Sequence, residues 1–504
     1  MASAPPPSVV PLPAFRILHS QAHTLARLGL FSPSAVSRPG KSNVSAIPTP
    51  NFILPTSRGT IPHITPDNAR KHVDIPAVFV SLEDFVDKSA LKSPVAQSNR
   101  KIRDYISLLP PLANPTQQIP IFLSPRRSCP VPTSQPNSAN TVSIVTNDGF
   151  RQLPISDYFT LVSQLKDEDT VIVAPVDLPL LVSPMNSLDA TRTSKPWKHI
   201  GGNRVRKMVT RNEQWSVSTL KKFAAQNAVI VPLLPGISVL EQAPYLDSIL
   251  TVEQDTAVAD GNVHRRIDGL NVMELASPFI PESYEPVARA PACDPARDTT
   301  LTSSPTVDFG ILPKEVHDVL RLNLGYQSGP HDVIAAVERG HDLVCGDWLT
   351  ATTDAGIAFT FEISGNPMPR DGEKVAIGIS LWENDVYAAD LSPLSDECEC
   401  YTCKHHHRAY VAHLLATKEM LAWTLLQIHN IHTVNRFMRA IRDAIKDDKF
   451  VDLAAEFRRK YIPQLEGVTP GGGPRVRGYQ VKLAGAMTNK KLNESPFQNF
   501  SNAS

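Results

Sequence analysis

Residues 398–404 of this chain read Cys398-Glu399-Cys400-Tyr401-Thr402-Cys403-Lys404. This short stretch holds half of the six cysteines, and three histidines follow it at residues 405–407. Three thiolates at this spacing, with a histidine on a following helix, are typical of a tetrahedral zinc site. The spacing alone leaves three histidines open as the fourth ligand, namely His413, His429 and His432. The alternative, three unrelated cysteines in a turn, would leave their clustering beside histidines unexplained.

Composition limits the classes of protein to which the chain can belong. Its 504 residues are 42% hydrophobic, which is enough to bury one large core or two ordinary ones. The 50 basic residues balance the 50 acidic ones, so any nucleic-acid binding needs a local basic patch. The scattered Cys129, Cys293 and Cys345 argue against a disulfide framework and favour a reducing, cytoplasmic compartment. No apolar run approaches the length needed to span a membrane.

Apolar strands and helix-length spacers alternate through most of the chain. The expected strands are residues 51–54, 76–80, 141–145, 170–175, 228–234, 320–324, 343–345 and 358–361. A helix is expected to begin at Pro66, with Thr65 as its N-cap. Fully apolar strands with such spacers predict a parallel sheet covered on both faces. At this length we expect a closed TIM (β/α)8 barrel, with an open doubly wound sheet as the alternative.

The same features divide the chain into five parts. The barrel carries two Pro-rich surface insertions, near 108–139 and 277–312. A long helix is expected from about Arg408 to about Lys446 in the C-terminal subdomain. The predicted parts are a disordered N-terminus (1–13), the barrel (14–397), a zinc-binding subdomain with the long helix (398–450), a helical end (451–468) and a flexible tail (469–504).

The zinc segment also carries a resemblance to a known family. It continues through Arg-Ala-Tyr, His-Leu-Leu, Glu-Met-Leu and Ile-His-Asn, so Cys398–Asn430 resembles the C-terminal zinc subdomain of tRNA-guanine transglycosylases. Members of that family are TIM barrels that exchange a guanine in tRNA for a queuine-type base. The resemblance covers most of residues 14–450 and selects His429 as the fourth ligand. It therefore implies one structural Zn²⁺ held by Cys398, Cys400, Cys403 and His429.

The family needs one carboxylate as nucleophile and a second for proton transfer. In the segment Gly340–Asp347, Cys345 stands at the nucleophile position. The second carboxylate falls on Thr146 in a gapless comparison, with Asp148 a short slip away. A thiol without nearby activation is far more typical of a buried strand residue than of a nucleophile.

The base pocket of the family is altered as well. Its glycine-rich segments are replaced by Leu234-Pro235-Gly236 and by residues 268–273, which end in Met273. Glycines there permit close backbone approach to a flat ligand, so their loss indicates a filled pocket. Asp177 is similar to the base-recognising aspartate, although a structural role at the end of a barrel strand is equally open.

A retained scaffold and zinc site with an eroded catalytic set resembles the non-catalytic, accessory branch of the family. No catalytic residue is therefore expected in this chain. The resemblance implies a heterodimer with the catalytic subunit of queuine tRNA-ribosyltransferase, acting on tRNA with guanine at wobble position 34, and leaves queuine open as a ligand. It implies a cytoplasmic protein, with peripheral attachment to the mitochondrial outer membrane as an alternative.

Two groups of basic residues are candidates for contact with tRNA phosphates. Arg436, Arg439, Arg442 and Lys446 share one face of the expected long helix. The other group is the run Arg204–Lys207 with Arg211 beyond it. A solvated surface is the alternative interpretation of both groups.

Two other functions stay open. The first is an active transglycosylase with a displaced nucleophile, either Asp342 or Asp347. Strand alternation would put Asp347 on the face of Cys345, which favours it over Asp342. The second is a protein that binds queuine or tRNA without any enzyme partner.

Overall fold

The structure is a computed structural model that describes most of the chain. The described residues are 14–21, 24–33, 44–86, 89–128, 136–146, 149–177, 202–234, 237, 239–251, 267–272, 312–325, 327, 329–362, 374–382 and 384–463. The predicted disordered N-terminus, most of the insertion near 277–312 and the predicted tail lie outside these residues.

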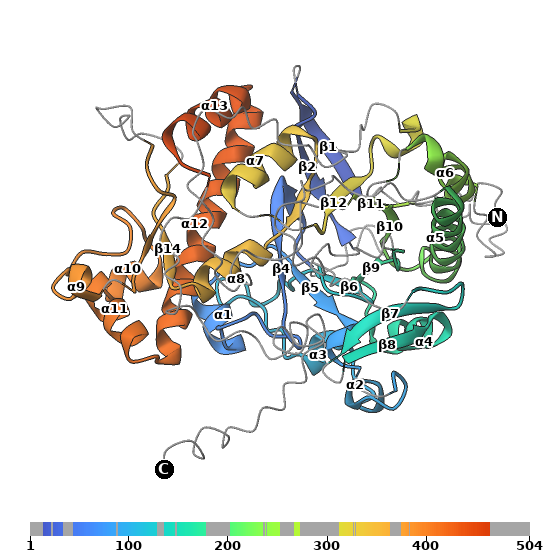
Figure 1. The fold of residues 1–504 in the computed structure, drawn as a ribbon, viewed down its shortest axis with the longest axis horizontal. Helices are drawn as coiled ribbons and strands as arrows, with labels where there is room; N and C mark the ends of the chain where they lie inside the picture. The colour runs from blue at the N-terminus through green and yellow to red at the C-terminus, as the bar shows by residue number, and fades with distance from the viewer. Residues whose placement is uncertain are drawn as a thin grey trace, which may run out of the picture.

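Eight parallel strands close into a barrel in chain order, because the last strand pairs with the first (Figure 1). They are β4 (Asn51–Pro55), β5 (Val78–Ser81), β6 (Ile121–Ser124), β9 (Val171–Val173), β10 (Val229–Leu233), β11 (Gly269–Val272), β12 (Leu320–Asn323) and β13 (Leu343–Cys345). This closed barrel confirms the TIM prediction, and the doubly wound alternative is wrong. Strands such as β5 and β10 are buried at every position, as expected for a parallel sheet between a packed interior and outer helices.

Helices follow most of the barrel strands on the outside of the barrel. They are α1 (Pro66–His72), α2 (Pro94–Gln97), α3 (Ile102–Tyr105), α4 (Ile155–Leu165), α5 (Gly202–Phe223), α6 (Ala243–Leu250), α7 (Pro330–Glu338) and α8 (Asp347–Asp354). The predicted start of α1 is confirmed, since Thr65 Oγ1 accepts a hydrogen bond from the Asn68 amide at 3.3 Å.

An antiparallel sheet closes the floor of the barrel, where the strands begin. It consists of β1 (Phe15–Ser20), β2 (Arg27–Phe31) and β3 (Ile47–Thr49). The Phe31 ring lies 5.9 Å from the Phe122 ring of β6, centroid to centroid, so β2 plugs the barrel interior. Arg27 of the same strand is ion-paired with Asp342, immediately before β13.

Several strand assignments differ from the sequence prediction. The segment 108–139 is not wholly an insertion, because it contains the barrel strand β6. The expected barrel strand at 141–145 is instead β7 (Thr141–Thr146), which forms an antiparallel hairpin with β8 (Gly149–Pro154) beside the barrel. The last expected strand is β14 (Ile357–Phe359), and it pairs only with β15 (Gly378–Ser380) among the described residues.

The C-terminal subdomain is helical and packs against one side of the barrel (Figure 1). Its helices are α9 (Asn384–Tyr387), α10 (Tyr401–His405), α11 (Arg408–Ala416), α12 (Met420–Lys446) and α13 (Phe450–Lys460). The single helix predicted from Arg408 to Lys446 is wrong, because Lys418 takes a φ of 59° and separates α11 from α12. Among the described residues, no helix has both the length and the apolar content that crossing a membrane requires.

Helix α12 joins the subdomain to the barrel. It contacts α8, β14 and the floor strands β1 and β2. On its basic face Arg436, Arg439 and Lys446 are exposed, as the solvated-face alternative expects. Arg442 differs, because its Nη1 donates to the Pro50 carbonyl at 2.8 Å and burial lowers its pKa to about 10.

Candidate metal centre and barrel mouth

Four side chains predicted as metal ligands meet beside α12. Their ligand atoms, the Sγ atoms of Cys398, Cys400 and Cys403 and Nδ1 of His429, lie within 4.8 Å of one another. The distances from His429 Nδ1 to the three sulfurs are 3.5, 3.6 and 3.4 Å, in chain order. His413 and His432, left open by spacing alone, lie outside this cluster.

The spacing of these atoms fits a tetrahedral zinc ion. With Zn–S bonds of about 2.3 Å and a Zn–N bond of about 2.0–2.1 Å, tetrahedral angles put sulfur and nitrogen about 3.5 Å apart. The three S···N distances lie within 0.2 Å of one another, at 3.4 to 3.6 Å. They therefore fit the sulfur–nitrogen spacing of a tetrahedral donor set.

The surrounding residues orient this donor set. His429 is fully buried, and its Nε2 lies 2.8 Å from the Phe359 carbonyl oxygen, to which it donates. That hydrogen bond leaves Nδ1 without a proton and able to bind a metal. Cys400 caps α10 through its sulfur, which accepts from the Cys403 amide at 3.3 Å, and Thr402 Oγ1 ties α10 to the Leu425 carbonyl at 2.7 Å.

Proton sharing among the thiols favours negative charge in the cluster. Hydrogen bonds from Cys398 and Cys400 lower the pKa of the Cys403 thiol to about 3. A hydrogen bond from Cys400 also lowers the pKa of Cys398, whereas hydrogen bonds with Cys398 and Cys403 raise the pKa of Cys400. A divalent cation would stabilise all three thiolates together, which a proton shared among them cannot do.

The barrel mouth, where the strands end, holds Cys345 at the end of β13. The Cys345 Sγ–H group donates to Asp347 Oδ2 at 2.9 Å. Ser128, which follows β6, donates its hydroxyl to the same oxygen at 2.5 Å. Asp347 is the first residue of α8 rather than part of the strand, so the alternation that predicted its face does not apply. Its carboxylate nevertheless lies beside the thiol.

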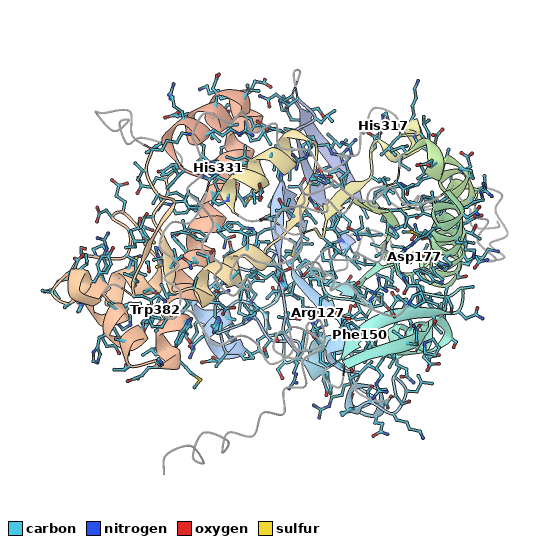
Figure 2. The ribbon with its side chains drawn as sticks, in the orientation of Figure 1. Arg127, Phe150, Asp177, His317, His331 and Trp382 are labelled. Atoms are coloured by element: carbon cyan, nitrogen blue, oxygen red, sulfur yellow. The ribbon has the colours of Figure 1, made fainter. Side chains whose placement is uncertain are left out.

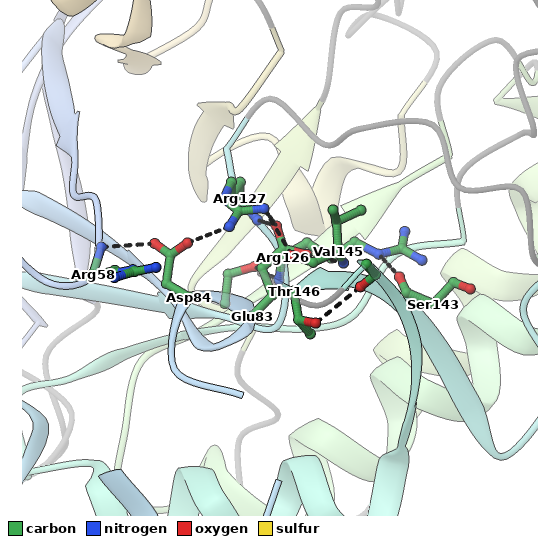
Figure 3. Close-up of polar contacts among 10 residues, drawn as sticks. Arg58, Glu83, Asp84, Arg126, Arg127, Ser143, Val145 and Thr146 are labelled. Atoms are coloured by element: carbon green, nitrogen blue, oxygen red, sulfur yellow. Dashed lines mark hydrogen bonds and ion pairs between the residues drawn. The ribbon is translucent and has the colours of Figure 1, made fainter. Parts of the chain in front are cut away.

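A second acidic group lies at the mouth just after β5, and the sequence interpretation missed it. Glu83 accepts hydrogen bonds from the amides of Arg127 and Val145 at 2.8 and 2.9 Å, while Asp84 pairs with the Arg127 guanidinium at 2.6 Å (Figure 3). Burial raises the pKa of Glu83, and the positive charge of Arg127 acts against that rise. Arg127 therefore binds both acids from within the chain.

Asp177, the candidate base-recognition residue, is also held by side chains of its own chain. Figure 2 marks the position of Asp177. Its Oδ1 accepts from Asn137 Nδ2 at 2.5 Å, and its Oδ2 accepts from Arg211 Nε at 2.6 Å. Only 2% of its surface is exposed. Arg126 in turn holds Asn137, because its Nη2 donates to Asn137 Oδ1 at 2.9 Å.

The other positions predicted from the family pattern are not brought to the mouth as a catalytic set. Thr146 ends β7, and its hydroxyl donates to the Gly149 carbonyl at 3.0 Å within the hairpin. Asp148, Pro235, Gly236 and Met273 lie outside the described residues. Leu234 is fully buried, and its backbone amide donates to Gln242 Oε1 at 2.7 Å.

Asp342 lies at the opposite end of β13 from the mouth. Its side chain is inaccessible to solvent and accepts two hydrogen bonds from Arg27 and one from the Arg321 amide, at 2.7 Å. These contacts serve the barrel floor, which removes the support for Asp342 as a displaced nucleophile.

The acids and arginines at the mouth could have been predicted from the sequence. Adjacent parallel strands end at the same edge of a sheet, so acids after one strand and arginines after its neighbour are expected to meet. Glu83 and Asp84 follow β5, and Arg126 and Arg127 follow β6. Placing residues 121–124 in an insertion concealed that relationship.

Comparison with known proteins identifies the family of the chain. A family model for queuine tRNA-ribosyltransferase matches residues 312–463. The chain is similar to queuine tRNA-ribosyltransferase accessory subunit 2 of Schizosaccharomyces pombe, with 31% identity over 464 residues that span 89% of this chain and 88% of that protein. It is 37% identical over 150 residues to queuine tRNA-ribosyltransferase of Caldanaerobacter subterraneus subsp. tengcongensis, spanning 30% of this chain and 36% of that protein. The corresponding Psychrobacter sp. protein is 39% identical over 140 residues, spanning 27% and 34%. The chain therefore belongs to the queuine tRNA-ribosyltransferase family.

Proposed function

We propose that this chain is the non-catalytic subunit of a heterodimeric queuine tRNA-ribosyltransferase, in which the partner exchanges guanine for queuine at tRNA position 34. The observation that carries the proposal is the contact between Cys345 and Asp347 at the mouth. The thiol donates a hydrogen bond to the carboxylate at 2.9 Å, and a neighbouring negative charge disfavours the thiolate that an attack would require. Similarity to an accessory subunit over 89% of this chain supports the same role.

Three carboxylates at the mouth are already hydrogen-bonded to side chains of this chain, which supports the proposal that this chain does not itself exchange the base. A nucleophilic carboxylate must reach the ribose, and a second group must exchange a proton with the base. Glu83 and Asp84 bind Arg127, and Asp177 binds Asn137 and Arg211. Each would first have to give up a charge-assisted hydrogen bond within the chain.

We also propose that the four-ligand cluster binds one Zn²⁺. Thiolate and imidazole ligands select zinc over the oxygen-binding magnesium and calcium ions. Four ligands from one chain leave no coordination position for substrate, so the ion would be structural. It would fix residues 398–403 to α12, which in turn contacts the barrel.

Reconstitution tests the proposal for the chain as a whole. Purified full-length chain, the catalytic subunit and an equimolar mixture would each be assayed for incorporation of labelled queuine into tRNA. We expect incorporation with the mixture and none with this chain alone. Exchange by this chain alone, at a rate that scales with its concentration, would overturn the proposal.

An active enzyme that uses Asp347 is the second candidate, because this carboxylate lies at the mouth beside Cys345. A covalent adduct between the chain and tRNA, lost in Asp347→Asn, would support that function. A stand-alone binding protein would instead purify from its native source without a catalytic subunit, and a stoichiometric subunit would exclude it.

We place the complex in the cytoplasm, where three clustered thiols remain reduced and able to bind metal. Peripheral attachment at the mitochondrial outer membrane is the alternative. Fractionation of cells with and without the catalytic subunit would distinguish an intrinsic location from one conferred by that partner.

A further inference from the structure

A basic groove runs along the outer face of α5, the helix between β9 and β10. The groove is open to solvent and has a volume of about 410 Å³, and its described lining residues other than Ala139 come from α5. They include Arg206, Lys207 and Arg211, together with the polar Asn203, Thr210 and Gln214. Positions three or four apart share a helix face, so these side chains form one continuous stripe. None of these described lining residues is acidic, and Ala139 is the only apolar residue among them.

The charge of the groove is local, because the chain as a whole carries no net charge. Arg206 and Lys207 are exposed, whereas Val205, Met208 and Val209 on the opposite face are buried against the barrel. The single acid of α5, Glu213, accepts a hydrogen bond from Ser248 at 2.6 Å and is not among the groove residues. The side chains that face the groove therefore present an excess of positive charge.

The groove is held in a fixed position at the edge of the barrel mouth. Trp215 is buried in the inner face of α5, and its indole N–H donates to the Ala139 carbonyl at 2.8 Å, which fixes the groove wall. Arg211 Nε donates to Asp177 Oδ2 at 2.6 Å, and Asp177 follows β9 at the mouth. Because Arg211 also lines the groove, its ion pair with Asp177 connects the groove to the mouth.

We propose that this groove binds the sugar–phosphate backbone of an RNA strand that passes the mouth of the non-catalytic barrel. Guanidinium and ammonium groups would contact phosphates, while the amide and hydroxyl groups of Asn203, Thr210 and Gln214 would contact phosphate or ribose oxygens. From residue 203 to residue 214 the helix rises about 16 Å. That length matches several stacked nucleotides at about 3.4 Å each.

RNA fits the groove better than an acidic protein segment does. The described lining residues other than Ala139 are polar or cationic along the whole stripe, whereas protein interfaces usually need an apolar pocket for an anchoring side chain. A backbone of regularly spaced anions needs no such pocket. The inference rests on the proposed role in tRNA modification, since it assigns the RNA a second contact surface away from the catalytic subunit.

The test compares two double variants of the full-length chain. Arg206→Glu with Lys207→Glu reverses two charges inside the groove, and Lys221→Glu with Lys222→Glu reverses two exposed charges at the far end of the same helix. Binding of a fluorescein-labelled anticodon-arm RNA hairpin would be followed by anisotropy between about 50 and 200 mM salt. Thermal melting would check that both variants are folded.

We expect the groove variant to bind the hairpin at least about tenfold more weakly than the wild type, and the far-end variant within about threefold. Loss of two phosphate contacts would also reduce the slope of log affinity against log salt by about 1.4. An equal loss of hairpin affinity in both variants would show that the RNA responds to the overall positive charge of α5 and not to the groove, and it would overturn the inference.

Failure of RNA binding by the groove can be distinguished from failure of the proposed function. A folded groove variant with wild-type hairpin affinity refutes RNA binding by the groove, even where the wild-type heterodimer exchanges queuine normally. A groove variant that keeps its hairpin affinity but no longer co-elutes with the catalytic subunit shows that the groove is a protein contact, which also refutes the inference. Failure of the wild-type mixture to exchange queuine refutes the proposed function and leaves the affinity comparison unaffected.

Discussion

Arg27 and Asp342 form a two-point ion pair in the floor of the barrel, with Nε–Oδ1 and Nη2–Oδ2 distances of 2.9 and 2.5 Å. The side chains are 5% and 0% exposed, and the residues lie 315 positions apart. Arg27 also donates to the carbonyls of His317 and Val319, at 2.5 and 2.6 Å. One guanidinium thus connects β2 with the segments before β12 and β13.

Arg27→Met is expected to destabilise the chain by about 3–5 kcal/mol, because it leaves the Asp342 carboxylate buried without its counter-ion. Urea denaturation of the full-length variant would measure this loss as a change in the unfolding midpoint. A second substitution, Asp342→Leu, should recover part of the stability, since it removes the uncompensated charge.

The matched control for that prediction is Arg458→Met. Arg458 forms a two-point ion pair with Glu338 in the same region, but its side chain is 41% exposed. Exposed pairs contribute about 1 kcal/mol or less because water screens them. Equal losses for the buried and exposed arginines would contradict the role assigned to burial.

His429→Ala is expected to abolish metal binding by the four-ligand cluster and to unfold the C-terminal subdomain at a lower temperature than the barrel. A structural metal contributes directly to folding free energy, so the loss should reach several kcal/mol. Metal analysis of purified protein should fall from about one zinc per chain to near zero. Treatment of the wild type with a chelator should reproduce the early transition.

Exposed His413 supplies the control for the cluster, because it lies on α11 outside the donor set. His413→Ala should keep its zinc and melt like the wild type. Wild-type melting of His429→Ala after complete loss of zinc would refute a structural role for the metal.

The sequence predicted the barrel well where the strands are apolar throughout. The segments at 76–80, 170–175 and 228–234 contain β5, β9 and β10, and every residue of these three strands is buried, as a parallel sheet covered on both faces requires. The same criterion failed at 141–145, since β7 is buried at every position after Thr141 but pairs with β8 in a hairpin. Arg151 and Gln152 of β8 are both exposed, and as consecutive strand residues they lie on opposite faces. Strand β8 is therefore not covered on both faces, unlike a barrel strand such as β5.

The donor set was predictable because its cysteines are close in sequence and metal chemistry permits few ligand types. Two other contacts at the mouth were not predictable, since each joins residues far apart in the chain. Ser128 and Asp347 are 219 positions apart, and Asp177 and Arg211 are 34 apart across a strand–helix connection. No local periodicity encodes such pairs, and only the closed barrel brings them together.

His331 is expected to make the stability of the chain fall in mildly acidic solution. Its Nε2 lies 3.2 Å from the Tyr461 carbonyl oxygen, and its ring packs edge-on against Phe457. Burial lowers the pKa of His331 below its ordinary value of 6.5. The unfolded state therefore binds the proton first, and stability that is present above pH 6.5 is lost as the pH falls through and below that value.

The measurement is the free energy of unfolding between neutral pH and pH values below 6.5 for the wild type and His331→Gln. Burial also lowers the pKa of His72, His406 and His432, so the wild-type decline has several sources and only the difference between the proteins reports on His331. The decline should be smaller in His331→Gln and unchanged in His413→Gln. Parallel curves for His331→Gln and the wild type would rule out the assigned contribution.

Cys345→Ala and Asp347→Asn are expected to leave queuine exchange by the reconstituted heterodimer within about twofold of the wild type. In this chain Asp347 accepts hydrogen bonds from Cys345 and from Ser128, so each substitution removes packing and hydrogen bonds worth about 1 kcal/mol each. Loss of a true nucleophile would instead reduce turnover on the order of a thousandfold or more. Initial rates at saturating tRNA, with the amount of heterodimer determined by gel filtration, separate these outcomes. A large loss in Asp347→Asn with intact assembly would transfer catalysis to this barrel, and it would identify the carboxylate beside Cys345 as the displaced nucleophile.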